Sequence, residues 1–299
     1  MVNRGVGLYD RRMVIGRLAP TPSGGLHLGN ARTFLVAWLS ARAAGGRVVL
    51  RIDDLDVTRV KPVYVEQALA DLRWLGFDWD GEPVSQSQRG AAYAAALEAL
   101  RSAGLIYPST ASRRELSLAG RAPHEGEEVM ARADTDCTPA WRFRATREPV
   151  EFDDAICGRC AMATDDFVVN RADGIAAYQL ATVVDDHFQG VTEVVRGDDL
   201  LTSTPRQVLV ARSLGIALPR YVHVPLVLDA GGERMAKRRD SARLEALREA
   251  GVSASRVVGM LAASCGWVNE GEEWMPGGLV DRFDLAKLPR WPVQLRGLT

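Results

Sequence analysis

A histidine follows a run of glycines near the start of the chain, within PTPSGGLHLGN over residues 20–30. Glycines allow the backbone to approach a ligand closely, and the imidazole of His27 can donate a hydrogen bond to a phosphate oxygen. The stretch lies between an expected strand and an expected helix, whose N-terminus attracts anions. It therefore fits a phosphate-binding turn, although a glycine-rich turn with a purely structural histidine would have the same sequence.

A second basic cluster lies about 200 residues further on, in GGERMAKRRDS over residues 231–241. Its lysine, Lys237, stands among arginines after two glycines, and such a loop suits the neutralisation of phosphate charge. A solvent-exposed basic turn is the alternative, since runs of Lys and Arg are weak motifs on their own.

Together the two clusters resemble the paired signatures of class I aminoacyl-tRNA synthetases, the first at 20–30 and the second at 234–238. The sequences around residues 16–33 and RIDDLD at 51–56 resemble the glutamyl-tRNA synthetases. VVDDHFQGVTEVVRGDDLL at 183–201 resembles the short glutamyl-Q tRNA(Asp) synthetases. The resemblance implies an α/β fold: a Rossmann-type catalytic domain with a parallel sheet, an insertion subdomain similar to an acceptor-binding one, and a short helical C-terminal region.

The reaction implied by this resemblance is attack of the glutamate α-carboxylate on the α-phosphate of ATP, with release of pyrophosphate. His27 would steady the transition state and Lys237 would neutralise the leaving pyrophosphate, with Mg²⁺ shared between protein and phosphates. The ATP-binding residues carried over from the family are Pro20, Gly24, Gly25, His27, Gly29, Asn30 and Lys237.

The resemblance also implies a glutamate site, made of Arg17, Leu18, Ala19, Pro20, Thr21, Asp53, Tyr178 and Arg196. A side-chain carboxylate is best bound by guanidinium groups, a role that falls to Arg17 and Arg196, with the hydroxyl of Tyr178 beside them. Read without the family, Arg196 could be a surface charge at a strand end and Tyr178 a core residue. Asp53 stands where the family has a glutamate that meets the substrate ammonium. It is one methylene shorter, so contact would need a shifted substrate or a bridging water, and amino-acid specificity stays open.

The zinc of many short relatives is not expected here. Ser109 and Ala111 stand where those relatives have a pair of cysteines, and neither side chain supplies a thiolate. A different pair, Cys157 and Cys160, has the C-x-x-C spacing of half a zinc site or of a redox motif. Further ligands at a helpful spacing are missing, so we expect two free cysteines on a turn and no metal held by the protein itself.

The elements that would position these residues are predicted from hydrophobic periodicity. An apolar strand at 13–18, a helix at 30–42 with Asn30 as N-cap and Gly45-Gly46 at its end, and a strand at 47–52 predict a βαβ unit. Its first loop would lie at the carboxyl edge of a parallel sheet, where such sheets bind ligands. Further helices are predicted at 64–75, 91–103, 204–214, 241–250 and 255–265, and β-structure at 140–152, 166–171, 192–196 and 221–228. Residues 174–184 fit either a helix end or a buried strand.

Length and composition fit this scheme. The chain has 299 residues, 47% hydrophobic and 25% charged, with a net charge of −1. We expect a first catalytic half at 13–106, an insertion at 107–172, a second catalytic half at 173–228, and the Lys237 loop with a helical region at 229–299. An apolar run of about 20 residues is absent and no apolar segment comes after the arginines of residues 1–12, so neither a membrane span nor a secretory signal is expected. A monomer in the reducing cytoplasm is the simplest expectation.

The acceptor is predicted from the short length of sequence after the second cluster. Lys237 lies 62 residues from the end of the sequence, too few for a typical further domain of about 100–150 residues. The chain thus resembles the glutamyl-Q enzymes, which attach glutamate to the queuosine base in the anticodon of tRNA(Asp). Two other functions stay open: a ligase that passes the activated acid to a small amine, and a non-catalytic relative that binds tRNA or nucleotide.

Overall fold

Two sheets form the centre of the molecule. The structure is a computed structural model that describes residues 13–111, 138–146, 148–228 and 243–295. One sheet is parallel, in the order β1-β2-β3, and the other has the order β7-β6-β10-β9, with only the β6–β7 pair antiparallel. Their strands are β1 (Ile15–Leu18), β2 (Arg47–Ile52), β3 (Val84–Ser85), β6 (Val150–Asp154), β7 (Gly158–Met162), β9 (Glu193–Gly197) and β10 (Arg220–Val224). The two sheets adjoin at β1 and β9. The N–H of Thr192, the residue just before β9, donates to the carbonyl oxygen of Ile15 in β1 at 2.9 Å.

The predicted βαβ unit at the start of the chain is confirmed. β1 pairs in parallel with β2, from Ile15 opposite Arg47 to Leu18 opposite Leu50, and α1 (Leu28–Ala43) joins them. The helix ends before Gly45, which has a φ of 65°, as the glycine pair predicts. The predicted N-cap is wrong: His27, not Asn30, caps α1, and Asn30 lies one turn inside the helix.

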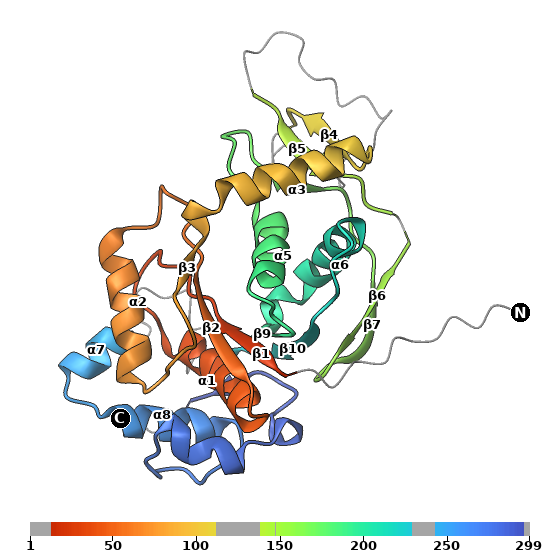
Figure 1. Ribbon diagram of the computed structural model, residues 1–299. Helices are drawn as coiled ribbons and strands as arrows, with labels where there is room; N and C mark the ends of the chain where they lie inside the picture. The colour runs from red at the N-terminus through yellow and green to blue at the C-terminus, as the bar shows by residue number, and fades with distance from the viewer. Residues whose placement is uncertain (1–12, 112–137, 147, 229–242, 296–299) are drawn as a thin grey trace, which may run out of the picture.

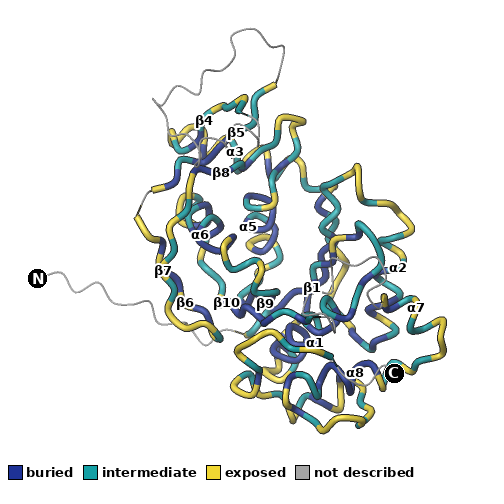
Figure 2. The backbone as a smooth tube through the Cα atoms, turned by 180° about the vertical axis from the view of Figure 1, so that it is seen from behind, coloured by how far each residue is buried: buried dark blue, intermediate teal, exposed yellow. Residues whose placement is uncertain are grey.

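Helices surround the sheets (Figure 1). They are α2 (Pro62–Trp74), α3 (Gly90–Ser102), α5 (Tyr178–Phe188), α6 (Thr204–Ser213), α7 (Leu244–Glu249) and α8 (Ala254–Ser264). The ambiguous stretch at 174–184 therefore contains the start of a helix, which begins at Tyr178. Buried residues concentrate where α1 packs between the strands and α8 (Figure 2), in a cluster that includes Leu35, Leu39, Leu50 and Leu261. This rigid centre fixes the carboxyl ends of β1 and β2.

The stretch predicted as an insertion contributes to two sheets. β4 (Ile106–Ser109), β5 (Ala140–Phe143) and β8 (Phe167–Asn170) form an antiparallel sheet beside α3 (Figure 1). By contrast, β6 and β7 extend the sheet of β9 and β10, since Asp154 pairs in parallel with Tyr221. The division of the chain at 107 and 172 stays a prediction.

The C-terminal part of the described chain packs under α1 (Figure 1). A buried guanidinium connects them: Arg32 of α1 donates to the carbonyl oxygen of Pro225 at 2.8 Å and to the hydroxyl of Ser264 at 2.9 Å. A short parallel pair, β11 (Val227–Leu228) with β12 (Val293–Gln294), closes this region. Within the described ranges, every helix is too short or too polar to cross a lipid bilayer.

Candidate active site

A pocket of about 560 Å³ opens at the carboxyl ends of β1 and β9. Most of the predicted site residues line it: Arg17, Ala19, Pro20, Thr21, Gly24, Gly25, His27, Gly29, Asn30, Asp53, Tyr178 and Arg196. Leu18 does not, because its side chain is fully buried in the core. Lys237 lies outside the described residues, so its place beside His27 stays a prediction. The structure thus brings together both ends of the predicted site, the glycine-rich turn and the guanidinium pair.

His27 has a structural task on one side of its ring. Its Nδ1 accepts hydrogen bonds from the N–H groups of Gly29, at 3.1 Å, and Asn30, at 3.3 Å, while the Asn30 side chain accepts from the N–H of His27. This reciprocal cap requires an unprotonated Nδ1, so the neutral ring carries its proton on Nε2. A Cβ atom on Gly29 would lie 3.0 Å from His27 Cε1, so a side chain at this position would crowd the imidazole ring. The cap therefore leaves the imidazole with a donor on Nε2, the type of group that binds a phosphate oxygen.

The described residues on either side of the Lys237 segment lie close to this pocket. Val227, just before it, lines the pocket. Arg243, just after it, forms an antiparallel bridge with His27, and the N–H of Leu244 donates to the carbonyl oxygen of Leu26 at 2.9 Å. The described residues on both sides of 229–242 thus lie at this pocket.

Arg196 is a buried cation with neutral neighbours. It is 4% exposed and donates to Gln207 Oε1 at 2.7 Å, to Thr204 Oγ1 at 2.8 Å, to His223 Nε2 at 3.1 Å and to the hydroxyl of Tyr178 at 3.4 Å. Within the described ranges no carboxylate forms an ion pair with it. A buried guanidinium without a counter-charge is costly, and an anionic ligand at the pocket wall would supply that charge.

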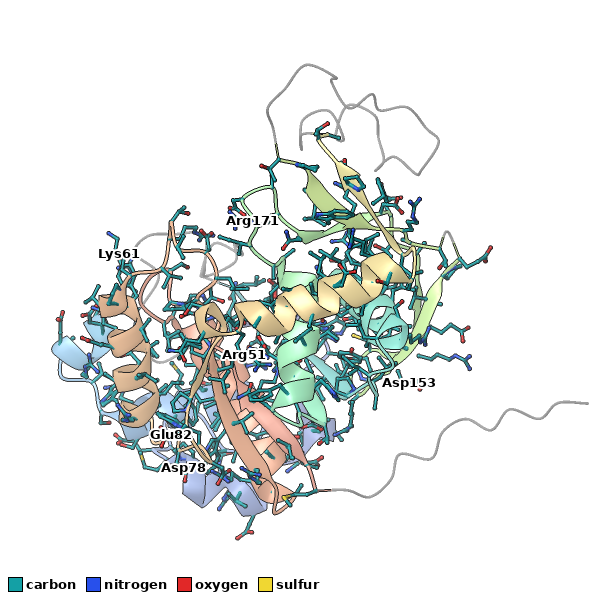
Figure 3. All side chains as sticks on the ribbon, turned by 45° about the horizontal axis from the view of Figure 1, so that its top comes forward. Arg51, Lys61, Asp78, Glu82, Asp153 and Arg171 are labelled. Carbon is teal, nitrogen blue, oxygen red and sulfur yellow. The ribbon has the colours of Figure 1, made fainter. Side chains whose placement is uncertain are left out.

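A second group of charges lies where β2 faces α5 (Figure 3). Arg51 donates from Nε to Asp53 at 2.6 Å and from Nη1 to Asp186 at 2.5 Å, and Arg17 Nε lies 3.7 Å from the same Asp186 oxygen. Burial alone would lower the pKa of Arg51, but the two carboxylates raise it well above its usual value. Burial raises the pKa of Asp53 despite this guanidinium, and burial lowers that of Arg17. Two cations and two anions thus compensate each other at the pocket wall.

Arg17 lines the pocket and is partly engaged by the protein. Its Nη1 donates to the carbonyl oxygen of Val195 at 2.5 Å, and its buried Nε faces Asp186 without a hydrogen-bond partner within the described chain. Asp53, in contrast, is already held by Arg51. An incoming ammonium would share this carboxylate with Arg51.

Several residues of the site escape prediction from the sequence. Arg51 and Asp186 belong to the two sequence blocks that resemble the family, but nothing in those blocks singles them out. His223 and Asp154, which contact each other behind Arg196, gave one weak signal. His223 is a polar residue within an apolar strand, and Asp154 occupies an inward-facing position of the alternating strand VEFDD.

The described residues hold no group of three or more His, Cys, Asp or Glu side chains that could bind a metal ion. Ser109 ends β4 and Ala111 lies two residues beyond it. Cys157 and Cys160 lie on and after the turn between β6 and β7, without a disulfide. Burial raises the pKa of Cys157 to about 11, with Asp154 adding to the effect, so at neutral pH it is a thiol and a weak ligand or nucleophile.

A parallel sheet whose first strand enters a glycine-rich turn and a capped helix, with the pocket at that edge, defines a Rossmann-type nucleotide-binding catalytic domain. The chain belongs to the tRNA synthetases of class I (E and Q), whose catalytic-domain family model matches residues 13–276. The fold and family expected from the sequence are thereby confirmed. Membership of this family implies the use of ATP.

Individual relatives agree with this assignment. Over 310 residues the chain is 47% identical to a glutamyl-Q tRNA(Asp) synthetase of Symbiobacterium thermophilum, with 95% of this chain and 96% of the relative covered. A glutamyl-Q tRNA(Asp) synthetase of Nocardia farcinica is also 47% identical, with 93% and 91% covered. Among solved structures, a glutamate tRNA ligase from Elizabethkingia meningosepticum, in complex with its amino acid, is similar with a TM-score of 0.80 and 25% identity. That match covers 95% of this chain and 67% of the ligase.

Proposed function

We propose that the protein activates glutamate with ATP as an adenylate and transfers it to the queuosine base in the anticodon of tRNA(Asp). The similarity to glutamyl-Q tRNA(Asp) synthetases over nearly the whole length of both chains supports this function. The observation that carries it is the buried Arg196, which lines the same pocket as the glycine-rich turn and forms no ion pair with a described carboxylate. A cation of this kind suits the side-chain carboxylate of glutamate.

In this proposal the two walls of the pocket have separate tasks. The guanidinium groups of Arg17 and Arg196 bind the glutamate side chain, and the hydroxyl of Tyr178, which Arg196 contacts at 3.4 Å, adds a third polar group. At the other wall, Nε2–H of His27 and the backbone around Gly24, Gly25 and Gly29 receive the phosphates of ATP. The reactants are both anionic, so these groups act by orienting them and by stabilising charge on the α-phosphate.

The remaining groups of the reaction belong to the proposal as well. Lys237 would neutralise the pyrophosphate; the described residues that flank its segment, Val227 and Arg243, lie at the pocket and beside His27. Mg²⁺ would supply additional positive charge when bound with ATP. It commonly takes most of its ligands from phosphates and water, and the absence of a multi-ligand cage among the described residues is compatible with that.

The substrate ammonium would meet Asp53. Because Arg51 already donates to both oxygens of this carboxylate, at 2.6 and 3.5 Å, the ammonium would approach the pocket side of the same group, directly or through a water. A monomeric enzyme in the cytoplasm, where tRNA is charged, is the form in which we expect it to act.

The test has two stages. ATP–pyrophosphate exchange, measured across amino acids with and without tRNA, should depend on glutamate, whereas no exchange with any amino acid would favour a binding protein. Transfer of labelled glutamate should then occur to tRNA(Asp) that contains queuosine and not to tRNA(Asp) that lacks it. Robust charging of tRNA(Glu) without transfer to tRNA(Asp) would overturn the acceptor, and transfer to small amines alone would favour a small-molecule ligase.

A further inference from the structure

A buried histidine connects the pocket to the β6–β7 hairpin. His223 of β10 is fully buried and lies opposite Arg196 in the register of β10 and β9. Its Nε2 accepts from Nε of Arg196 at 3.1 Å, and its Nδ1 lies 2.7 Å from Oδ2 of Asp154, the last residue of β6. Three neighbouring strands thus supply one continuous chain of side chains, Asp154–His223–Arg196.

The direction of these hydrogen bonds is fixed at both ends. A guanidinium only donates, so Nε2 of His223 accepts, and the neutral ring must carry its proton on Nδ1. That proton points at Asp154, whose Oδ2 also accepts from the N–H of His223 at 3.1 Å. Burial lowers the pKa of His223, with the Arg196 charge adding to the effect despite Asp154, and this keeps the ring neutral.

Asp154 is itself held in place. Its other oxygen, Oδ1, accepts from the N–H groups of Ile156 and Cys157 at 2.9 and 2.8 Å. Burial would raise the pKa of Asp154, but the hydrogen bonds from His223 and from these amides outweigh burial and lower it. The carboxylate is therefore ionised at neutral pH, and it selects the Nδ1–H tautomer of His223, as the aspartate of a catalytic triad does for its histidine.

His223 does not line the pocket, so it acts through Arg196. By accepting from Nε, it fixes one edge of the planar guanidinium. Gln207 and Thr204 hold the other nitrogens, at 2.7 and 2.8 Å. Without an acceptor at Nε, the guanidinium would lose one of the contacts that set its plane.

We infer that His223, in the tautomer selected by Asp154, is a positioning residue that orients the Arg196 guanidinium toward the carboxylate of the amino-acid substrate. The inference rests on the proposed function for the identity of that substrate, but the tautomer itself does not depend on it.

A pair of substitutions separates the two nitrogens of the ring. His223→Gln can place its amide oxygen near the position of Nε2 and preserve the acceptor for Arg196. His223→Asn keeps a donor near Nδ1 for Asp154 but loses the acceptor. In glutamate-dependent pyrophosphate exchange, we expect His223→Asn to raise the KM for glutamate roughly 10- to 100-fold, the effect of losing a hydrogen bond to a charged group. His223→Gln should stay within about threefold of the wild type, and the KM for ATP should change in neither variant.

Asp154→Asn provides an independent variant. Its amide can still accept from Ile156 and Cys157, but it would turn its NH₂ group toward Nδ1. The imidazole would then shift its proton to Nε2, donor against donor with Arg196, and the KM for glutamate should rise as in His223→Asn. The ¹⁵N shifts of the imidazole report the tautomer directly, and the chain has only four histidines.

The outcomes distinguish this inference from the proposed function. A wild-type His223 with its proton on Nε2 would overturn the inference whatever the enzyme does. So would folded His223→Asn and Asp154→Asn variants, with circular dichroism spectra like that of the wild type, that keep the wild-type KM for glutamate. Should these variants fail to fold, the wild-type tautomer still decides the matter. A wild type with the Nδ1–H tautomer but no glutamate-dependent exchange would instead refute the proposed function alone.

Discussion

Replacing Arg196 with lysine keeps the buried positive charge but removes the planar fork. The guanidinium donates from all three nitrogens, to His223, Thr204, Gln207 and Tyr178. A lysine ammonium is a single point donor and cannot serve these acceptors and a substrate carboxylate together. Loss of one hydrogen bond to a charged group costs about 1.5–3 kcal/mol. We therefore expect Arg196→Lys to lower kcat/KM for glutamate by roughly 10- to 100-fold, at about 1.4 kcal/mol for each factor of ten.

The assay is ATP–pyrophosphate exchange with glutamate and ATP varied separately. The loss should appear in the KM for glutamate while the KM for ATP stays the same, because the proposal assigns the phosphates to the glycine-rich turn and not to Arg196. Arg159→Lys is the matched control, since Arg159 is 73% exposed and pairs only with Glu151 among the described residues. A change in kcat/KM for glutamate below threefold, in a folded Arg196→Lys variant, would refute the assignment of Arg196 to the substrate carboxylate.

Three further predictions concern the rest of the pocket and the core. His27→Asn should keep the helix cap, because an asparagine oxygen can replace Nδ1, but it loses the Nε2 donor. We expect kcat for exchange to fall roughly 10²- to 10³-fold with little change in Tm; an unchanged kcat would leave His27 a purely structural cap. Asp53→Glu extends the carboxylate by one methylene toward the substrate ammonium and should lower the KM for glutamate, and a raised KM would count against contact with the ammonium. Asp71 is buried, its carboxylate oxygens lack hydrogen-bond partners within the described chain, and burial raises its pKa to about 6 although Arg248 Nη1 lies 3.4 Å away and opposes the rise. Because the folded-state pKa is raised, the wild-type protein loses stability as the pH rises from about 4 to about 6. Asp71→Asn does not have this loss. Its free energy of unfolding relative to the wild type, measured by urea denaturation, should therefore be about 1–3 kcal/mol more favourable at pH 8 than at pH 4. An equal effect of Asp71→Asn at both pH values would contradict this.

The local part of the fold was readable from the sequence. The βαβ unit at residues 13–52 depends on short-range signals, apolar strands and a glycine pair, and these were sufficient. The cap of α1 was not, because Asn30 is the better N-cap by residue type, whereas His27 occupies that place and uses an imidazole nitrogen as the acceptor. The stretch at 174–184 was undecided for a similar reason. Its apolar run fits a helix or a strand until tertiary packing selects one.

The contacts between charged side chains at and behind the pocket could not be predicted from the sequence. Arg51 meets Asp186 across 135 residues of sequence, and His223 meets Asp154 across 69. No periodicity specifies which carboxylate a buried arginine will contact at such separations. The residues that line the pocket were found because they match a family pattern, whereas the partners that compensate their charge are visible only once the strands lie side by side.

The integration of β6 and β7 into the central sheet limits how freely this protein can be recombined. A graft that exchanged residues 107–172 for those of another synthetase would carry away Asp154, and with it the only carboxylate that His223 contacts in the described chain. Such a hybrid could keep every residue of the pocket wall and still bind its amino acid poorly. An exchange of residues 107–172 meant to change tRNA preference should therefore take the new segment from a synthetase that has an aspartate at the end of the strand equivalent to β6.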